Sequence, residues 1–121
     1  MQQPVFLNLL QIRLPIMGVV SILHRVSGVL LFLCIPALLY VFALSLSGEE
    51  GFQTVSTLLD SLLFRLLGIV LLWCLLHHLL AGFRFLLLDL DVGVERRDAR
   101  VSAYSVLMGG AVLAVIAGLL L

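Results

Sequence analysis

The sequence predicts an all-α integral membrane protein, a bundle of three transmembrane helices. Three observations support this prediction. Hydrophobic residues make up 63% of the 121 positions, and only 12% are charged. A soluble domain of this size leaves much of its surface in water and cannot hide so much apolar side chain. Three stretches without charge each approach the roughly 20 residues that cross a bilayer core as a helix. They are Val26–Gly48, Leu66–Phe83 and Val101–Leu121.

The flanking residues extend these stretches into spans at about residues 16–47, 58–88 and 100–121. Pro15 favours a helix start, because proline fits a first helical turn. Pro36 falls within the first span and predicts a kink there. An acidic linker, Gly48–Asp60, joins the first two spans, and a linker with several arginines, Asp89–Arg100, joins the last two.

The distribution of arginine predicts the orientation, since the chain contains no lysine. Arginines gather before or within the start of the first span and in the second linker: Arg13, Arg25, Arg96, Arg97 and Arg100. The positive-inside rule places this face, and with it the amino terminus, in the cytoplasm. Arg65 is the exception, and Asp60 is a candidate partner for it. The net charge is zero and no basic patch is present, which argues against nucleic acid as a partner.

The segment Ser21–Gly28 reads Ser-Ile-Leu-His-Arg-Val-Ser-Gly at the edge of the first apolar stretch. Charge beside hydrocarbon is costly and usually functional. Ser21 and Arg25 are four residues apart and share a helix face, with His24 beside them. This group could bind a polar head that carries an apolar tail. Alternatively, Arg25 and His24 extend to lipid phosphates.

His77 and His78 lie midway along the second apolar stretch. A neutral imidazole is a good axial ligand of haem iron. His78 shares a face with Cys74 and Gly82, and the glycine leaves room for a flat macrocycle. His77 points about 100° away, beside Trp73, so only one of the two histidines faces a given partner well. The alternatives are a proton carrier and a hydrogen-bonded structural histidine. A six-coordinate b-type haem needs a second histidine, here from another subunit.

Two further patterns narrow the function. Small residues recur at helical spacing in the third span and suit close helix contact, although such residues are also common in membrane helices. They are Gly110, Ala114, Ala117 and Gly118. The sequence has no Ser-His-Asp order, phosphate loop or paired intramembrane carboxylates. We therefore expect no catalytic residues, and the chain does not look like a self-contained enzyme.

Three motifs resemble the succinate dehydrogenase cytochrome b556 subunit family, the larger membrane anchor of respiratory complex II. Leu9–Pro15 is similar to the amphipathic lead-in of that family, and Ser21–Gly28 matches its first signature. His78–Asp89 resembles the second signature, a His followed by Gly, Arg and Asp at fixed offsets. The resemblance covers residues 4–121. It implies one anchor domain over 1–121 with a lead-in at about 4–14, within a larger helical bundle completed by a second anchor subunit.

The resemblance also implies the site residues. Ser21 and Arg25 would line the pocket for ubiquinone, with Ser21 bonded to a quinone oxygen and Arg25 stabilising developing negative charge. His78 would be the axial ligand of haem b and so bind its iron, and His24 and Arg25 would lie near the haem propionates. Phe85 stands where many relatives carry a further histidine, which leaves His78 as the main candidate.

The implied function is electron transfer from succinate to quinone, in a complex with three partners. These are the second membrane anchor subunit, which supplies the other haem ligand, the iron–sulfur subunit and the flavoprotein subunit. The implied location is the bacterial cytoplasmic (inner) membrane, in contact with lipid. Alternatives are a haem-free structural anchor, the anchor of a quinol:fumarate reductase, and a small transporter with His77 or His78 as proton relay. The transporter fits poorly, because three spans are few.

Overall fold

The computed structural model describes residues 13–120, which form four helices and, within that range, no strand. The helices are α1 (Ile16–Ser45), α2 (Glu49–Asp60), α3 (Leu62–Asp89) and α4 (Arg96–Leu120). Helices α1, α3 and α4 have 30, 28 and 25 residues and are apolar enough to cross a membrane. At about 1.5 Å per residue, each exceeds the hydrocarbon thickness of roughly 30 Å. The prediction of an all-α protein with three membrane helices is confirmed.

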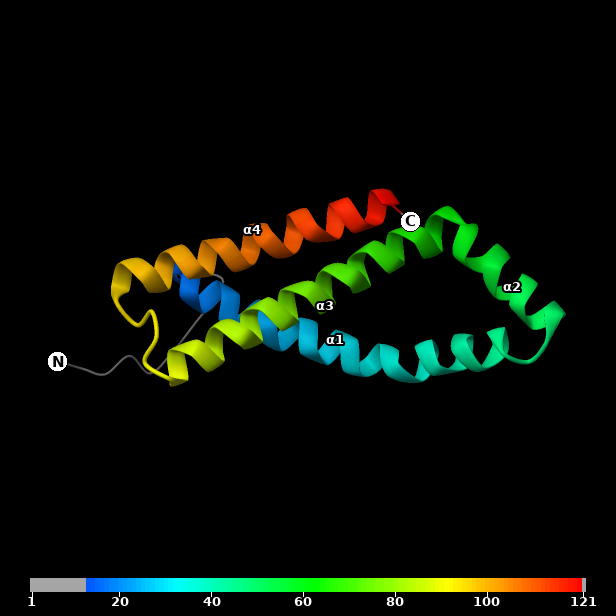
Figure 1. Cartoon of the computed structure of the whole chain (residues 1–121), viewed down its shortest axis with the longest axis horizontal. Coiled ribbons are helices and arrows are strands. Elements are labelled where there is room, and N and C mark those ends of the chain that lie inside the picture. Colours follow the sequence, from blue (N-terminus) through cyan, green and yellow to red (C-terminus); the bar gives the residue numbers. More distant parts are fainter. Residues whose placement is uncertain (1–12, 121) are drawn as a thin grey trace.

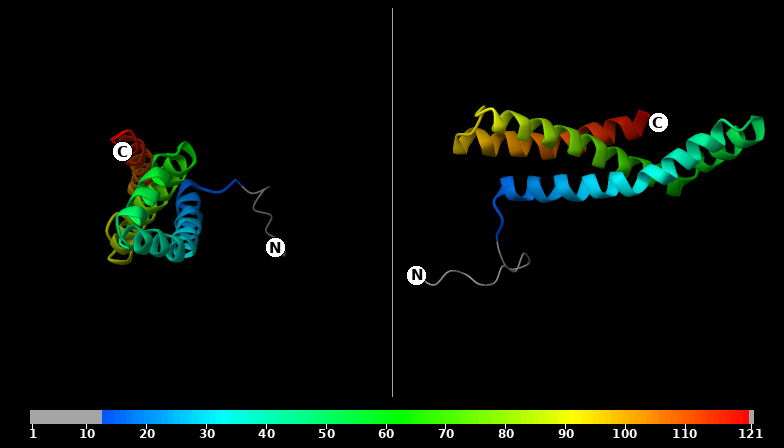
Figure 2. Two further views of the ribbon diagram at one scale, coloured as in Figure 1. Left: turned by 90° about the vertical axis from the view of Figure 1, so that its right-hand side faces the viewer. Right: turned by 90° about the horizontal axis from the view of Figure 1, so that it is seen from below.

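The three long helices lie side by side, and α3 makes the most extensive contacts with both of the others. Figure 1 shows the start of α1 and the α3–α4 connection at one end of the bundle, with α2 at the other. The two further views agree that α1 and α4 run roughly along α3 (Figure 2). The arginine-rich linker and the start of α1 therefore share one end, as the charge pattern predicts. Of the lead-in at about residues 4–14, residues 4–12 lie outside the described part of the chain.

Local sequence explains where α1 begins and ends. Pro15 caps its amino end with a φ of −63°, close to the value that the proline ring imposes. The helix continues through Pro36 and ends at Ser45. Gly48 then adopts a φ of +132°, a conformation that residues with a β-carbon rarely reach. The chain turns at this glycine, away from the axis of α1.

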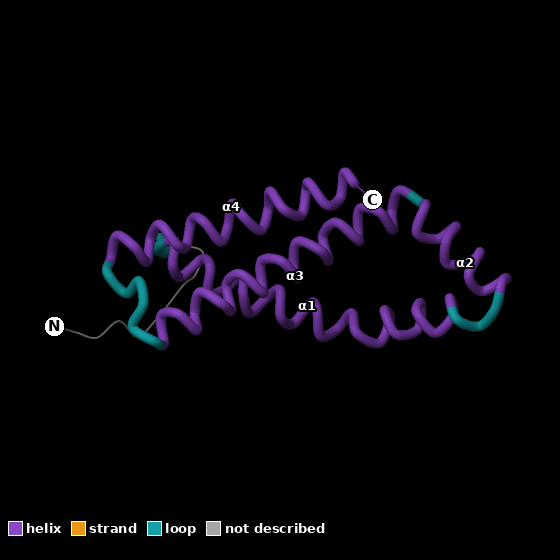
Figure 3. The backbone as a smooth tube through the Cα atoms, in the orientation of Figure 1, coloured by secondary structure: helices purple, strands orange, loops and turns teal. Residues whose placement is uncertain are grey.

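The first linker differs from the sequence-based expectation, because it forms the separate helix α2 (Figure 3). Glu49 and Glu50 lie in its first turn, where negative charge is favourable to the helix dipole. Gly51 and Val55 are buried against the neighbouring segments. Ser61 adopts an extended conformation and separates α2 from α3. The second membrane helix consequently begins at Leu62.

The connection between α3 and α4 is a tight turn. Asp91 has a φ of +60° and Gly93 a φ of +73°. Aspartate tolerates this left-handed conformation better than most residues, and glycine adopts it freely. The turn reverses the chain and lays α4 against α3 (Figure 1).

Small side chains allow the helices to approach closely. The core is built around Val20, Ala81, Ala103 and Val106. A β-carbon added at Gly110 of α4 would lie 3.4 Å from the Cα of His77 in α3, so the two backbones nearly touch there. The stripe of small residues in the third span therefore includes a true helix contact. Of the three long helices, α1 is the least buried by the rest of the chain: 6% of the residues in its 18-residue apolar stretch are buried, against 22% in α4.

Candidate functional site

The polar centre of the bundle lies between α1 and α3, where His78 meets the His24–Gly28 turn. Nδ1 of His78 is 2.9 Å from the backbone carbonyl oxygen of His24 and 3.3 Å from Oγ of Ser27. The Ser27 hydroxyl donates to the same carbonyl at 2.9 Å. Two of the motifs that the sequence singled out, residues 21–28 and 78–89, are thus joined by direct hydrogen bonds.

This geometry assigns the proton on the His78 ring. A carbonyl oxygen can only accept, so Nδ1 of His78 must carry the hydrogen in the bond to His24. In the neutral imidazole Nε2 then keeps its lone pair, and this nitrogen has no hydrogen-bond partner among the side chains and backbone of residues 13–120. A histidine whose Nδ1–H is held by a carbonyl is the usual form of a metal-ligating histidine. His78 is only half-buried, so an external group can reach it.

His24 covers one face of the His78 ring. The two imidazoles stack with centroids 4.1 Å apart and planes 7° from parallel. Phe85 meets the His24 ring edge-on, with centroids 5.3 Å apart. Gly82 lies beside the His24 ring, since a β-carbon there would be 3.4 Å from Nε2 of His24, an ordinary contact distance. The room that Gly82 leaves on α3 is therefore bordered on one side by His24.

Gly28 is the glycine that makes room for His78. A β-carbon at this position would lie 2.8 Å from Cε1 and 3.2 Å from Nδ1 of His78. Contacts this short are not tolerated, so only glycine lets the ring approach the α1 backbone closely enough to bond the His24 carbonyl.

His77 has a different environment from its neighbour. Its side chain is fully buried, stacks on Trp73 with centroids 5.3 Å apart, and has Gly110 behind it. Neither of its ring nitrogens has a hydrogen-bond partner in the part of the chain that the structure describes. The packing leaves no path for a large planar group to reach it.

Ser21 lies on α1 one turn before the segment His24–Gly28 that meets His78, and Arg25 lies within that segment. Ser21 is half-buried, and Arg25 is exposed without an ion pair within residues 13–120. Both stand within the first ten residues of α1, or about 15 Å of its start. The structure thus brings His24 and His78 into contact, while Arg25 remains free for a group outside the chain.

A second polar contact joins α3 to α4. The Arg84 side chain is 5% exposed, and its Nε donates to Oγ of Ser102 at 2.9 Å. Its Nη2 donates to the backbone carbonyl of Ala99, also at 2.9 Å. Ser102 in turn donates to Ala99 at 3.2 Å. Arg84 therefore holds the start of α4 against α3.

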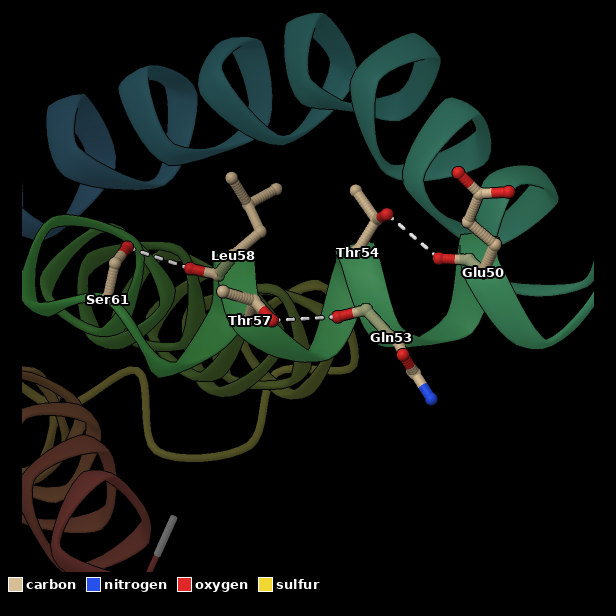
Figure 4. A pocket seen from close by; sticks show the side chains of 6 residues that line it. All are labelled: Glu50, Gln53, Thr54, Thr57, Leu58 and Ser61. Atoms are coloured by element: carbon tan, nitrogen blue, oxygen red, sulfur yellow. Dashed lines mark hydrogen bonds between the residues drawn. The ribbon is translucent and has the colours of Figure 1, made fainter.

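Two grooves on the surface lie away from the contact between His24 and His78. A groove of about 550 Å³ follows α2, lined by Glu50, Gln53, Thr54, Thr57, Leu58 and Ser61 (Figure 4). Its hydroxyls donate to carbonyls of their own segment, as in the bond from Thr54 to Glu50 at 2.8 Å. A groove of about 520 Å³ between α3 and α4 includes Arg84. The histidine contact lies instead on a face that is open beside α1 and α3.

Two residues that act at this contact were not predicted as site residues, namely Ser27 and Gly28. Both belong to the motif Ser21–Gly28, so the motif was the available signal for them. Their contact with His78 depends on the register of α1 against α3, which the motif alone does not contain. Arg65 and Asp60, by contrast, form the expected pair, with 2.9 Å between Nη2 and Oδ1.

Comparisons with known proteins bear on this site. A family model described as succinate dehydrogenase/fumarate reductase transmembrane subunit matches residues 1–117. The chain is 35% identical to the succinate dehydrogenase cytochrome b556 subunit of Coxiella burnetii, over 97% of this chain and 94% of that protein. It is 30% identical to the subunit of the same name from Paracoccus denitrificans, over 86% and 80% of the two chains. It is also 34% identical to the succinate dehydrogenase hydrophobic membrane anchor subunit of Halobacterium salinarum, over 77% and 72%.

Proposed function

The chain belongs to the succinate dehydrogenase/fumarate reductase transmembrane subunit family, and from this premise we propose that it holds a b-type haem through His78 and lines a quinone site with Ser21 and Arg25. A multi-pass membrane subunit of this family works in a complex with other subunits. The two cytochrome b556 relatives are named as succinate dehydrogenase subunits, which favours succinate as the electron source, and we take quinone as the acceptor. The quinol:fumarate direction would use the same site.

The single observation that carries the haem proposal is the hydrogen bond from His78 to the His24 carbonyl. It places the proton on Nδ1 and leaves the Nε2 lone pair for iron. Haem supplies one-electron redox chemistry when bound, and the protein contributes the ligand, its orientation and the surrounding charge. His78 is accessible from the open face, whereas His77 is sealed.

His24 does not serve as the second axial ligand together with His78. The His24 and His78 rings lie face to face with centroids 4.1 Å apart, so a haem could not fit between them. A second histidine ligand would therefore come from a partner, and we assign that role to the second membrane anchor subunit. We assign His24 and Arg25 to the haem propionates.

The same open face supports the choice of partners. Helix α1 carries Ser21, His24 and Arg25. Of the three long helices it buries the smallest share of its apolar stretch within the chain. A second anchor subunit can pack there and complete the bundle. The iron–sulfur subunit, with the flavoprotein beyond it, would dock at the arginine-rich end. By the positive-inside rule this end, with the amino terminus, faces the cytoplasm of a bacterial inner membrane.

Ser21 and Arg25 serve the quinone in different ways. The Ser21 hydroxyl can donate a hydrogen bond to a quinone oxygen and pass a proton to it. The Arg25 guanidinium stabilises negative charge that develops on that oxygen during reduction. Both act near the end of the membrane where electrons would arrive from the iron–sulfur subunit.

The haem assignment is tested by the reduced-minus-oxidised visible spectrum of the purified membrane complex. We expect a b-type α-band in the wild type, its loss in His78→Ala, and its retention in His77→Ala. His77→Ala is the matched control, because it removes the same side chain one position away. No band in the wild type would indicate a haem-free anchor, and equal loss in both variants would refute the choice of His78.

The quinone assignment is tested by comparing two electron acceptors in the same complex. Ser21→Ala and Arg25→Leu should lower succinate-dependent quinone reduction and leave reduction of an artificial dye at the soluble subunits unchanged. Arg65→Leu, at the other end of the bundle, is the control for loss of an arginine. If dye and quinone rates fell together, Ser21 and Arg25 would serve assembly and not the quinone.

A further inference from the structure

Ser27 is a buried hydroxyl in a helix that buries little else. It is 1% exposed, and Val20 is the other buried position described in α1. A hydroxyl removed from water costs free energy unless it is hydrogen-bonded, and inside a membrane no water replaces the bond. The partners of Ser27 therefore indicate why a polar side chain stands here.

The Ser27 hydroxyl, the His24 carbonyl and Nδ1 of His78 form a triangle of hydrogen bonds. The Ser27 hydroxyl proton goes to the His24 carbonyl at 2.9 Å, which leaves an oxygen lone pair for Nδ1–H of His78 at 3.3 Å. The same Nδ1–H bonds the His24 carbonyl at 2.9 Å. One N–H thus has two acceptors on α1. With the carbonyl alone, the ring could rotate about the hydrogen bond, and the second acceptor restricts that rotation.

The same arrangement recurs on the other side of α3. Arg84 donates both to Oγ of Ser102 and to the carbonyl of Ala99, three residues earlier, and Ser102 donates to that carbonyl. His78 relates in the same way to Ser27 and to His24, also three residues earlier. Two polar side chains of α3, His78 and Arg84, are thus each held by a serine and by the carbonyl three residues before that serine. Ser45 and Ser61 make i−3 bonds as well, but these bonds are exposed and hold no other side chain.

We propose that Ser27 is the positioning residue of the haem ligand: its hydroxyl, with the His24 carbonyl, sets the orientation of the His78 ring. This inference rests on the proposed haem ligation by His78 and adds to it a residue that does not itself touch the haem. The ring is bounded by the His24 stack, by Gly28 and by the Ser27–carbonyl pair. Without the Ser27 hydroxyl the His78 ring could rotate, while its Nε2 would still be present as a ligand.

The test is made on the purified complex with Ser27→Ala, Ser27→Cys and Ser27→Thr. Ser27→Ala should retain haem but transfer it to excess apomyoglobin about tenfold faster, at the lower end of the effect of losing a partner of a metal ligand. The low-spin ferric electron paramagnetic resonance signal, which depends on the orientation of the axial imidazoles, should shift or broaden. Ser27→Thr keeps the hydroxyl and should restore both properties.

Two comparisons separate positioning from packing. Ser27→Cys nearly conserves volume but bonds weakly, so it should behave like Ser27→Ala; a Cys variant with wild-type signal and transfer rate would overturn the proposal. Ser45→Ala removes an i−3 bond of α1 without a histidine partner and should change neither readout. If His78→Ala loses haem while Ser27→Ala matches the wild type, only the role of Ser27 fails. If His78→Ala keeps haem, the proposed function itself fails.

Discussion

Replacement of Gly28 by alanine tests the close approach of α1 and α3 most directly. The new β-carbon would lie 2.8 Å from Cε1 of His78, where an ordinary contact begins at 3.4 Å. The ring must therefore retreat from α1 by about 0.6 Å, since protein interiors are close-packed and cannot absorb the overlap. The bond from Nδ1 to the His24 carbonyl, now 2.9 Å, would lengthen to about 3.5 Å, beyond useful hydrogen-bond range.

The Gly28→Ala change costs free energy whether the His78 ring stays in place or moves. If the ring stays, overpacking costs about 1–3 kcal/mol. If the ring moves, the unmet hydrogen bond costs about 1–3 kcal/mol. Where the cost falls on the haem-bound form, it corresponds to roughly fivefold to 140-fold weaker haem binding, because about 1.4 kcal/mol is a factor of ten. We expect the Gly28→Ala complex to assemble with substoichiometric haem that is released faster.

The assay measures the haem-to-protein ratio and the rate of haem transfer, with dye-linked succinate oxidation as the check on assembly. Gly68→Ala is the matched control, since Gly68 lies in α3 and a β-carbon there meets nothing within 4 Å. That control should keep its haem, because alanine is the better helix former and no neighbour obstructs it. Equal haem content and transfer rate in Gly28→Ala and Gly68→Ala would refute the argument from contact distance.

Three further predictions concern the packing of the bundle. Gly110→Val should lower the thermal stability of the complex, at a cost of about 1–3 kcal/mol, because its side chain would meet the backbone of His77 at 3.4 Å; an unchanged midpoint would contradict the close α3–α4 contact. His77→Leu should keep haem and leave that midpoint unchanged or higher, since it removes two buried nitrogens without partners; a lower midpoint would mean that a partner subunit bonds this ring. Asp60→Asn should change stability by less than about 0.5 kcal/mol, because both members of its pair with Arg65 are exposed; a large effect would mean that assembly buries the pair.

The three membrane helices could be predicted because hydrophobicity and charge alone decide them. Segments of this length without charge have one stable form in lipid, and the arginines mark their ends. The Arg65–Asp60 pair was predictable because Asp60 is the acidic residue nearest to Arg65 in the sequence. Gly110 was visible as part of a stripe of small residues at helical spacing.

Helix α2 was harder to predict. A helix of 12 residues is marginal by itself in water, and Gly48 and Gly51 near its start argue against it. Its formation depends on contacts that bury Gly51 and Val55, together with the acidic first turn. Only the acidic turn can be seen in the sequence.

The neighbour of Gly82 could not be predicted for a comparable reason. A glycine one turn from His78 leaves the α3 backbone open to close approach. Which group approaches depends on the register of α1 against α3, and the structure places the His24 ring at that point. The same register brings Gly28 and Ser27 to His78. Motifs could identify the participants on each helix, but not which atom meets which across the interface.

One helical step places the two adjacent histidines in different environments. A rotation of about 100° turns His77 toward α4, where Gly110 lets the backbones close over it, and His78 toward α1, where Gly28 and the His24 carbonyl receive it. A ligand needs a free nitrogen, a fixed proton on the other nitrogen, and access for the iron. His78 meets all three conditions, whereas both nitrogens of His77 are sealed. His77 therefore cannot replace its neighbour in the His78→Ala variant, and the loss of the haem band in that variant would report on geometry and not on the number of histidines.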